Sequence, residues 1–162
     1  MPEHDRRLSI LFLCTGNSAR SIMAESIANT RFGDRLEAVS AGSHPKGSPH
    51  PLAVATLRRH GMATEGLASK SWDVYKDRRF DLVVTLCASA AKEVCPVFSG
   101  RPPKTHWGFP DPPECDDEEA AFQRVFEGLV EAIDRFVTDE QPNVVRRAAV
   151  VAEHVAGEFG RE

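Results

Sequence analysis

The 162-residue sequence predicts a single α/β domain, built on a parallel sheet whose faces are covered by helices. Two observations lead to this prediction. Apolar, β-rich runs alternate along the chain with segments of helical periodicity, and the connections between them are short. The run from Ile10 to Leu13 is apolar at every position, which is typical of a central strand buried on both faces.

Four strands are expected in order, at residues 8–13, 36–41, 80–86 and 105–109. Helices are expected at residues 21–32, 51–60, 89–94 and 117–137. The longest of them repeats apolar residues at helical spacing: Ala121, Phe122, Val125, Phe126, Leu129, Ile133 and Phe136. Residues 96–113 are rich in proline and glycine and predict an irregular loop.

We divide the chain into a domain at residues 1–140 and a C-terminal tail at residues 141–162. The tail has a moderate helical pattern over residues 143–159. Two roles are open for it, packing on the domain or self-association.

Charge and length exclude several classes of function. The net charge of −4 indicates neither a nucleic-acid surface nor an anionic membrane as partner. No apolar stretch approaches the length of a membrane span, and the first residues do not form a secretory signal. We therefore expect a cytoplasmic protein, in which four cysteines serve catalysis, redox chemistry or metal binding rather than permanent disulfides.

The first strand runs directly into a loop that begins with Cys14 and ends with Arg20. Successive N–H groups of such a loop, together with the N-terminus of the following helix, form a nest for a tetrahedral oxyanion. Arg20 offers a planar fork to two of its oxygens. The same positive field favours the thiolate of Cys14, which makes it a nucleophile. The expected oxyanion-binding residues are Thr15, Gly16, Asn17, Ser18, Ala19 and Arg20.

The plainer alternative is a buried cysteine that ends a strand, with an unrelated arginine at the surface. A spacing of Cys-x5-Arg alone would not exclude it. The position of this spacing between an apolar strand and a helix, with small residues inside, favours the oxyanion site.

Two further cysteines are expected at the same edge of the sheet. Cys87 ends the third strand and Cys95 follows it. Free cysteines are often buried as small apolar residues, and that alternative stays open for either one alone. Three cysteines at one edge favour a redox relay. Cys115 lies among acidic residues and is interpreted as a bystander; a zinc site formed by Cys87, Cys95, His106 and Cys115 lacks Cys-x2-Cys spacing.

Asp111 lies between two prolines in a loop that leaves the fourth strand. A restricted backbone and nearby aromatic side chains can aim its carboxyl group at the site as a general acid. The alternative is an ordinary turn aspartate before a helix. His106 and Trp107 are interpreted as structural residues.

These motifs resemble a known family. The loop from Cys14 to Arg20, extended through Ser-Ile-Met-Ala-Glu, is similar to the active-site loop of the low-molecular-weight protein tyrosine phosphatases and of the arsenate reductases that share their fold. Four further motifs resemble the arsenate reductase branch: Val39-Ser40-Ala41-Gly42, Val84-Thr85-Leu86-Cys87, Cys95-Pro96-Val97 and His106-Trp107-Gly108-Phe109. The resemblance covers roughly residues 8 to 137.

The resemblance implies a three-layer, flavodoxin-like fold with a four-stranded parallel sheet, and it implies a mechanism. Cys14 attacks arsenate held by the loop and Arg20, Ser21 stabilises the thiolate, and Asp111 protonates the departing oxygen. Cys87 then attacks the Cys14 sulfur and releases arsenite. Cys95 carries the disulfide outward to a thioredoxin- or glutaredoxin-type reductant. No tightly bound cofactor is expected.

Two departures from the family pattern affect the relay. Ala19 replaces a cysteine found in many relatives, although the implied mechanism does not use that thiol. Seven residues separate Cys87 from Cys95. A continuous helix would place their Cα atoms about 12 Å apart, whereas a disulfide needs roughly 4.4–6.8 Å. The segment must therefore be a loop or unwind, or a small thiol such as glutathione replaces Cys95.

Other readings stay open. A potassium ion binds near Asn17, Glu25 and Ser40 in some relatives, but Ser71 falls where those relatives supply an acidic ligand, so no ion is assigned. A phosphatase would use Cys14, Arg20 and Asp111 alone, because water can resolve its phosphocysteine. A non-enzymatic oxyanion or thiol sensor is the third alternative.

Overall fold

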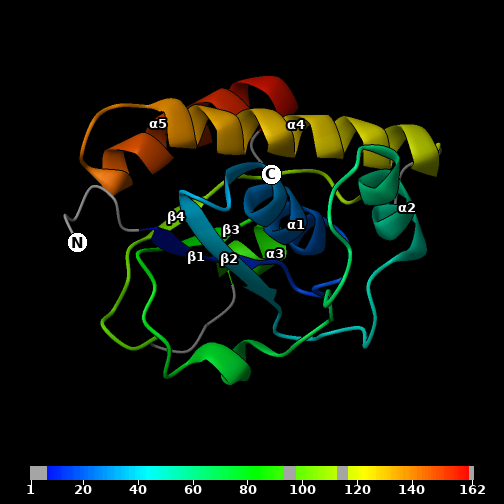
Figure 1. Cartoon of the computed structure of the whole chain (residues 1–162), viewed down its shortest axis with the longest axis horizontal. Helices are drawn as coiled ribbons and strands as arrows, with labels where there is room; N and C mark the ends of the chain where they lie inside the picture. Colours follow the sequence, from blue (N-terminus) through cyan, green and yellow to red (C-terminus); the bar gives the residue numbers. More distant parts are fainter. Residues whose placement is uncertain (1–6, 93–97, 113–116, 161–162) are drawn as a thin grey trace.

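The structure, a computed structural model, describes residues 7–92, 98–112 and 117–160. It contains a parallel sheet with strand order β2-β1-β3-β4. The strands are β1 (Leu8–Leu13), β2 (Leu36–Ala41), β3 (Leu82–Thr85) and β4 (Lys104–His106). The four-stranded parallel sheet of the sequence prediction is confirmed (Figure 1).

Five α-helices and a 3-10 helix accompany the sheet in the described residues. They are α1 (Arg20–Phe32), α2 (Pro51–Arg59), the 3-10 helix η2 (Trp72–Tyr75), α3 (Ala88–Lys92), α4 (Glu118–Thr138) and α5 (Val144–Phe159). In Figure 1, α4 and α5 run along one side of the molecule, and η2 lies on the opposite side of the sheet. The helix bounds differ from the predicted ones by at most two residues wherever the chain is described.

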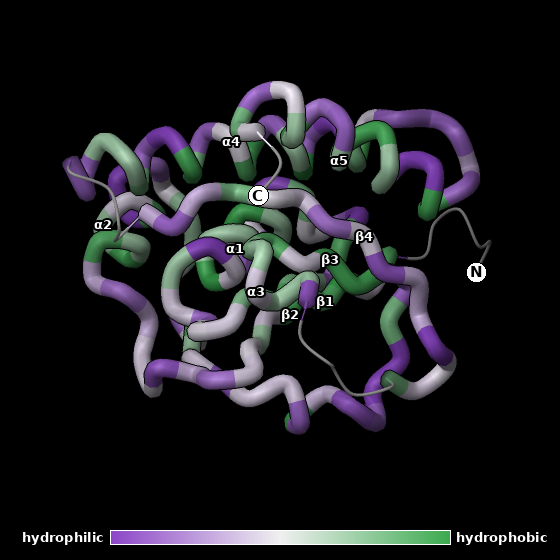
Figure 2. The backbone as a smooth tube through the Cα atoms, turned by 180° about the vertical axis from the view of Figure 1, so that it is seen from behind, coloured by the Kyte–Doolittle hydropathy of each residue, from purple (hydrophilic) through white to green (hydrophobic). Residues whose placement is uncertain are grey.

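The side chains of β1 show why this strand is apolar throughout. Ile10 and Phe12 pack into the main core together with residues of α1, α4 and α5. Leu11 and Leu13 point to the other face and pack with Phe80 and Phe98. Alternate side chains of a strand face opposite sides, so a central strand with two covered faces has no polar face. Figure 2 shows β1 as a hydrophobic segment at the centre of the fold.

The third and fourth strands are shorter than expected. The strand predicted at residues 80–86 is β3, and the one predicted at 105–109 is β4. Just before the third strand, the carboxylate of Asp81 accepts the N–H of Ser9 at 2.8 Å, and the N–H of Asp81 donates to the carbonyl of Ser9 at 2.8 Å. Beyond β4 the chain still donates from Trp107 to Thr85 and from Phe109 to Leu86. These bonds hold the segment before Asp111 against the carboxyl end of β3.

The C-terminal helix α5 packs on the domain. Ala148, Val151 and Val155 are buried in the main core. The indole Nε1 of Trp107 donates to the carbonyl of Ala148 at 3.1 Å, so Trp107 is a packing residue. Of the two roles considered for the tail, the structure displays packing on the domain.

Among the residues that the structure describes, no helix combines the length and the apolar character needed to span a membrane.

Candidate active site

Three carbonyl groups of the loop between β1 and α1 accept hydrogen bonds from the segment that follows β2. The carbonyls of Thr15, Gly16 and Ser18 accept hydrogen bonds from the backbone N–H groups of His44, Lys46 and His50, at 2.9, 3.0 and 2.8 Å. In a trans peptide the C=O and the following N–H point in opposite directions. The next N–H group in each case is therefore directed away from residues 44–50, which is the polarity of an anion-binding nest.

Asn17 fixes the shape of this loop. Its backbone is left-handed, with φ 44°, a conformation that asparagine tolerates better than most residues. The side chain is buried and bonded at both ends. Its Oδ1 accepts from the N–H of Lys70 at 2.7 Å, and its Nδ2 donates to Ser21 Oγ at 2.8 Å.

Ser21 connects this network to the candidate nucleophile. Its Oγ lies 2.9 Å from the Sγ of Cys14, and both residues are buried. When Cys14 is a thiolate it has no hydrogen to donate, so the Ser21 hydroxyl is then the donor in this contact. A hydroxyl that donates to sulfur stabilises the thiolate more than the thiol.

Arg20 is held from the segment that follows β4. Its Nη1 donates to the carbonyl of Phe109 at 2.9 Å, and its Nη2 lies 3.6 Å from Asp111 Oδ1. The Nε of Arg20 is buried and has no hydrogen-bond partner among the described residues. A bound oxyanion would satisfy this donor.

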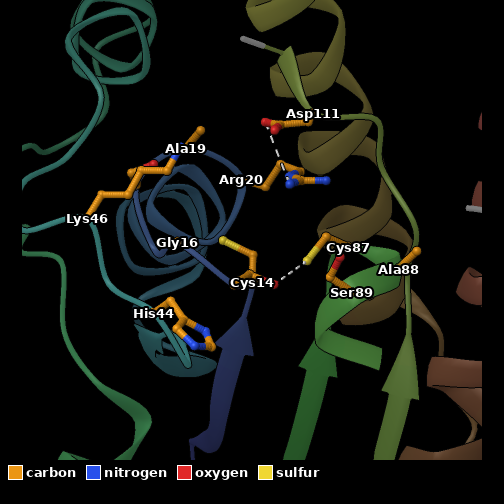
Figure 3. A pocket seen from close by; sticks show the side chains of 12 residues that line it. Cys14, Gly16, Ala19, Arg20, His44, Lys46, Cys87, Ala88, Ser89 and Asp111 are labelled. Atoms are coloured by element: carbon orange, nitrogen blue, oxygen red, sulfur yellow. Dashed lines mark hydrogen bonds and ion pairs between the residues drawn. The ribbon is translucent and has the colours of Figure 1, made fainter. Parts of the chain in front are cut away.

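These residues surround a pocket of about 410 Å³, shown in Figure 3. In this view Cys14 lies near the centre of the labelled side chains, with Arg20 and Asp111 above it and Cys87 beside it on the right. Cys14, Cys87 and Ala90 form a buried cluster. The Sγ of Cys87 lies 3.6 Å from Thr15 Oγ1 and accepts the N–H of Ala90 at 3.3 Å. The pocket therefore contains two thiols, a guanidinium group and a carboxyl group.

Comparison with known proteins identifies the family of this chain. The model of the low molecular weight phosphotyrosine protein phosphatase family matches residues 9–148. The chain belongs to this family. An arsenate reductase from Bacillus licheniformis is 40% identical over 132 residues, which cover 79% of this chain and 94% of that protein.

Two solved structures of the family have the same fold. An arsenate reductase from Archaeoglobus fulgidus superposes with a TM-score of 0.66 at 27% identity, over 80% of this chain and 99% of that one. A low molecular weight protein tyrosine phosphatase from T. tengcongensis superposes with a TM-score of 0.64 at 24% identity, over 78% and 95%. The fold is therefore shared by reductases and phosphatases.

Most of the residues selected from the sequence lie at the site. The pocket of this family member is lined by Cys14, Thr15, Gly16, Ser18, Ala19, Arg20, Cys87 and Asp111. Asn17 and Ser21 do not line the pocket; their side chains act on the loop through hydrogen bonds. Cys95 and Cys115 lie outside the described residues. The imidazole of His106 contacts Thr85, with Nδ1 2.8 Å from Oγ1, as suits a structural residue.

The sequence analysis missed the wall formed by His44 and Lys46. The aliphatic part of Lys46 lies over Gly16, where a Cβ atom would come within 3.1 Å of Lys46 Cε. The carboxyl-edge rule for parallel sheets could have found both residues, because they follow the end of β2.

The sequence analysis also missed Lys70. Its Nζ lies 3.8 Å from Glu25 Oε1, which also accepts the hydroxyl of Ser40 at 2.6 Å. Burial raises the pKa of Glu25, against the opposing effects of Ser40 and Lys70. The ammonium group of Lys70 therefore lies beside the carboxylate of Glu25. A positive charge at this place does not suit the potassium ion considered in the sequence analysis.

Proposed function

We propose that this protein is an arsenate reductase of the low molecular weight phosphatase family. The observation that carries the proposal is the second thiol, Cys87, on the wall of the Cys14 pocket. Reduction of arsenate to arsenite takes up two electrons, which two thiols supply when they form a disulfide. Hydrolysis of a phosphate ester takes up none, so a phosphatase has no use for Cys87.

The first step is attack on arsenic. The loop N–H groups and Arg20 hold arsenate above Cys14, and the Ser21 hydroxyl keeps the sulfur anionic. The thiolate forms a sulfur–arsenic bond, and one arsenate oxygen leaves as water after protonation. Asp111 lies beside Arg20 and supplies a proton to that oxygen.

The second step transfers the electrons. The thiolate of Cys87 attacks the sulfur of Cys14, and the electron pair of the sulfur–arsenic bond passes to arsenic. Arsenic(V) becomes arsenic(III) and leaves as arsenite, while Cys14 and Cys87 form a disulfide. The Ala90 N–H, bonded to the sulfur of Cys87, favours the attacking thiolate.

The third step restores the thiols. We propose that Cys95 attacks the disulfide and that a thioredoxin- or glutaredoxin-type protein reduces the resulting Cys87–Cys95 bond. Glutathione would serve if Cys95 takes no part. The proposal places the reaction in the cytoplasm, where such reductants keep thiols reduced.

The test is turnover with each reductant. The purified protein is supplied with arsenate and either a thioredoxin system or glutathione with glutaredoxin, and arsenite is measured. We expect arsenite with at least one system. If neither yields arsenite while a phenyl phosphate is hydrolysed, the protein is a phosphatase. The protein would be a sensor if it forms neither product and if reversible oxidation of Cys14 changes its binding to a partner.

A further inference from the structure

A second cluster of ligand-type side chains lies on α4 and α5, outside the Cys14 pocket. The Nε2 of His154 on α5 lies 3.2 Å from Glu131 Oε1 on α4 and 3.4 Å from Glu158 Oε2, one turn further along α5. The three atoms all lie within 4.8 Å of one another. They line a surface hollow together with Glu153 and Gly157.

The imidazole nitrogen in this cluster is unusual. The side chain of His154 is 30% exposed, but its Nε2 atom is covered and makes no hydrogen bond to any described residue, although the two carboxylate oxygens lie 3.2 and 3.4 Å away. Neither oxygen therefore lies in the direction in which the ring nitrogen would donate. A buried polar atom of this kind calls for a partner. An ion that contacts all three atoms would provide it.

The two distances from His154 Nε2 to the carboxylate oxygens suit one class of ion. Zinc binds imidazole nitrogen at about 2.0–2.1 Å and carboxylate oxygen at about 2.0–2.2 Å, usually in a tetrahedron. Neighbouring ligand atoms in such a tetrahedron lie about 3.4 Å apart. The two distances from His154, 3.2 and 3.4 Å, agree with this value.

We propose that Glu131, His154 and Glu158 bind a zinc ion that joins α5 to α4. The fourth position of the tetrahedron faces the hollow and takes water. Two carboxylates and a neutral imidazole carry a charge that a divalent cation neutralises. Arg135 donates to the same Oε1 of Glu131 at 3.2 Å and is the cation with which zinc shares that carboxylate.

The competing explanation is an ion pair between a protonated His154 and the two glutamates. Both explanations hold α5 against α4, so stability alone does not separate them. Direct measurement of metal binding does, provided that the cysteine thiolates, which also bind zinc, are blocked first.

The experiment uses full-length protein whose cysteines are carbamidomethylated with iodoacetamide and which is then freed of metal. Zinc chloride is titrated by calorimetry, and cobalt(II) serves as a spectroscopic substitute. We expect one equivalent of zinc to bind. The cobalt spectrum should have tetrahedral d–d bands without the charge-transfer band of a sulfur ligand. Saturating zinc should raise the melting temperature by about 5 °C.

Two variants locate the site. His154→Gln and Glu158→Gln should each weaken zinc binding at least about tenfold and abolish the thermal shift. Glu153→Gln, which alters a carboxylate of the same hollow outside the triad, should bind as the parent protein does. The proposal is overturned if the blocked protein binds no zinc, or if both triad variants bind it unchanged. Arsenate reduction is measured separately and does not enter this result.

Discussion

The hydroxyl of Ser21 lies 2.9 Å from the sulfur of Cys14 and accepts a hydrogen bond from the side chain of Asn17. Asn17 is itself held by the backbone N–H of Lys70, so a segment beyond β2 helps to hold the hydroxyl that contacts the nucleophile. Ser21 is thus placed to support the thiolate rather than to cap the helix.

Replacement of Ser21 by alanine removes this bond. A hydrogen bond to a charged group contributes about 1.5–3 kcal/mol, which corresponds to a rate loss of roughly 10- to 150-fold. We expect this loss in kcat for arsenate reduction. Ser89→Ala, on the wall of the same pocket, is the control and should change kcat little. Equal losses in the two variants would assign the effect to pocket packing.

Cys87→Ser tests the electron transfer. We expect arsenite formation to fall to the rate of Cys14→Ser, because serine cannot form the disulfide that supplies the electrons. Hydrolysis of a phenyl phosphate needs only Cys14, Arg20 and Asp111 and should survive in Cys87→Ser. Cys115→Ser is the control for a general thiol effect. A parallel loss of both activities in Cys87→Ser would make Cys87 structural.

Asp111→Asn separates binding from chemistry. Asparagine keeps the size of the side chain but supplies no proton to the leaving oxygen. We expect kcat to fall by about 10²- to 10⁴-fold. The inhibition constant of inorganic phosphate should change little, since Arg20 and the loop still hold the anion. An unchanged kcat would return Asp111 to the role of a turn residue.

The raised pKa of Glu25 makes the stability of the protein depend on pH. Burial, as the largest effect, raises its pKa above the ordinary value of 4.5. At a pH between 4.5 and the raised pKa of the folded state, Glu25 is protonated more often in the folded protein than in the unfolded chain. The contribution of Glu25 to stability is therefore fully present below 4.5 and is lost as the pH rises through the folded pKa.

The measurement is urea unfolding of the parent protein and Glu25→Gln over a series of pH values. Relative to this variant, the parent should lose free energy of unfolding as the pH rises from 4.5. Glu65→Gln, at an exposed position, should follow the parent curve. Parallel curves for the parent and Glu25→Gln would contradict the raised pKa.

Two neighbouring valines of α5 test its place in the core. Val151 is 1% exposed and Val150 is 55% exposed. Val151→Ala removes two buried methyl groups and should lower the free energy of unfolding by about 2–3 kcal/mol. Val150→Ala should stay within about 0.5 kcal/mol of the parent. A small effect at both positions would mean that α5 is a detachable tail.

Part of the site could be predicted from residues that are close in the sequence. Cys14 and Arg20 are joined by one short loop, and the apolar strand before them and the helix after them have clear periodicities. The identity of the chemistry, a thiolate next to an oxyanion nest, follows from this local pattern. The network of Asn17 did not follow from it, because its partner Lys70 is 53 residues away.

The sequence alone determined the order of the strands and helices along the chain, the loop from Cys14 to Arg20 and the presence of further cysteines. Local periodicity and spacing specify these features. Only the tertiary structure decided which residues meet. Cys87 is 73 residues from Cys14 (87 − 14), and it reaches the pocket because β3 pairs directly with β1. Asp111 meets Arg20 because the chain beyond β4 follows the end of β3, and Lys46 covers Gly16 because the chain turns back after β2. These contacts depend on sheet order and packing, which bring together residues that no local pattern connects.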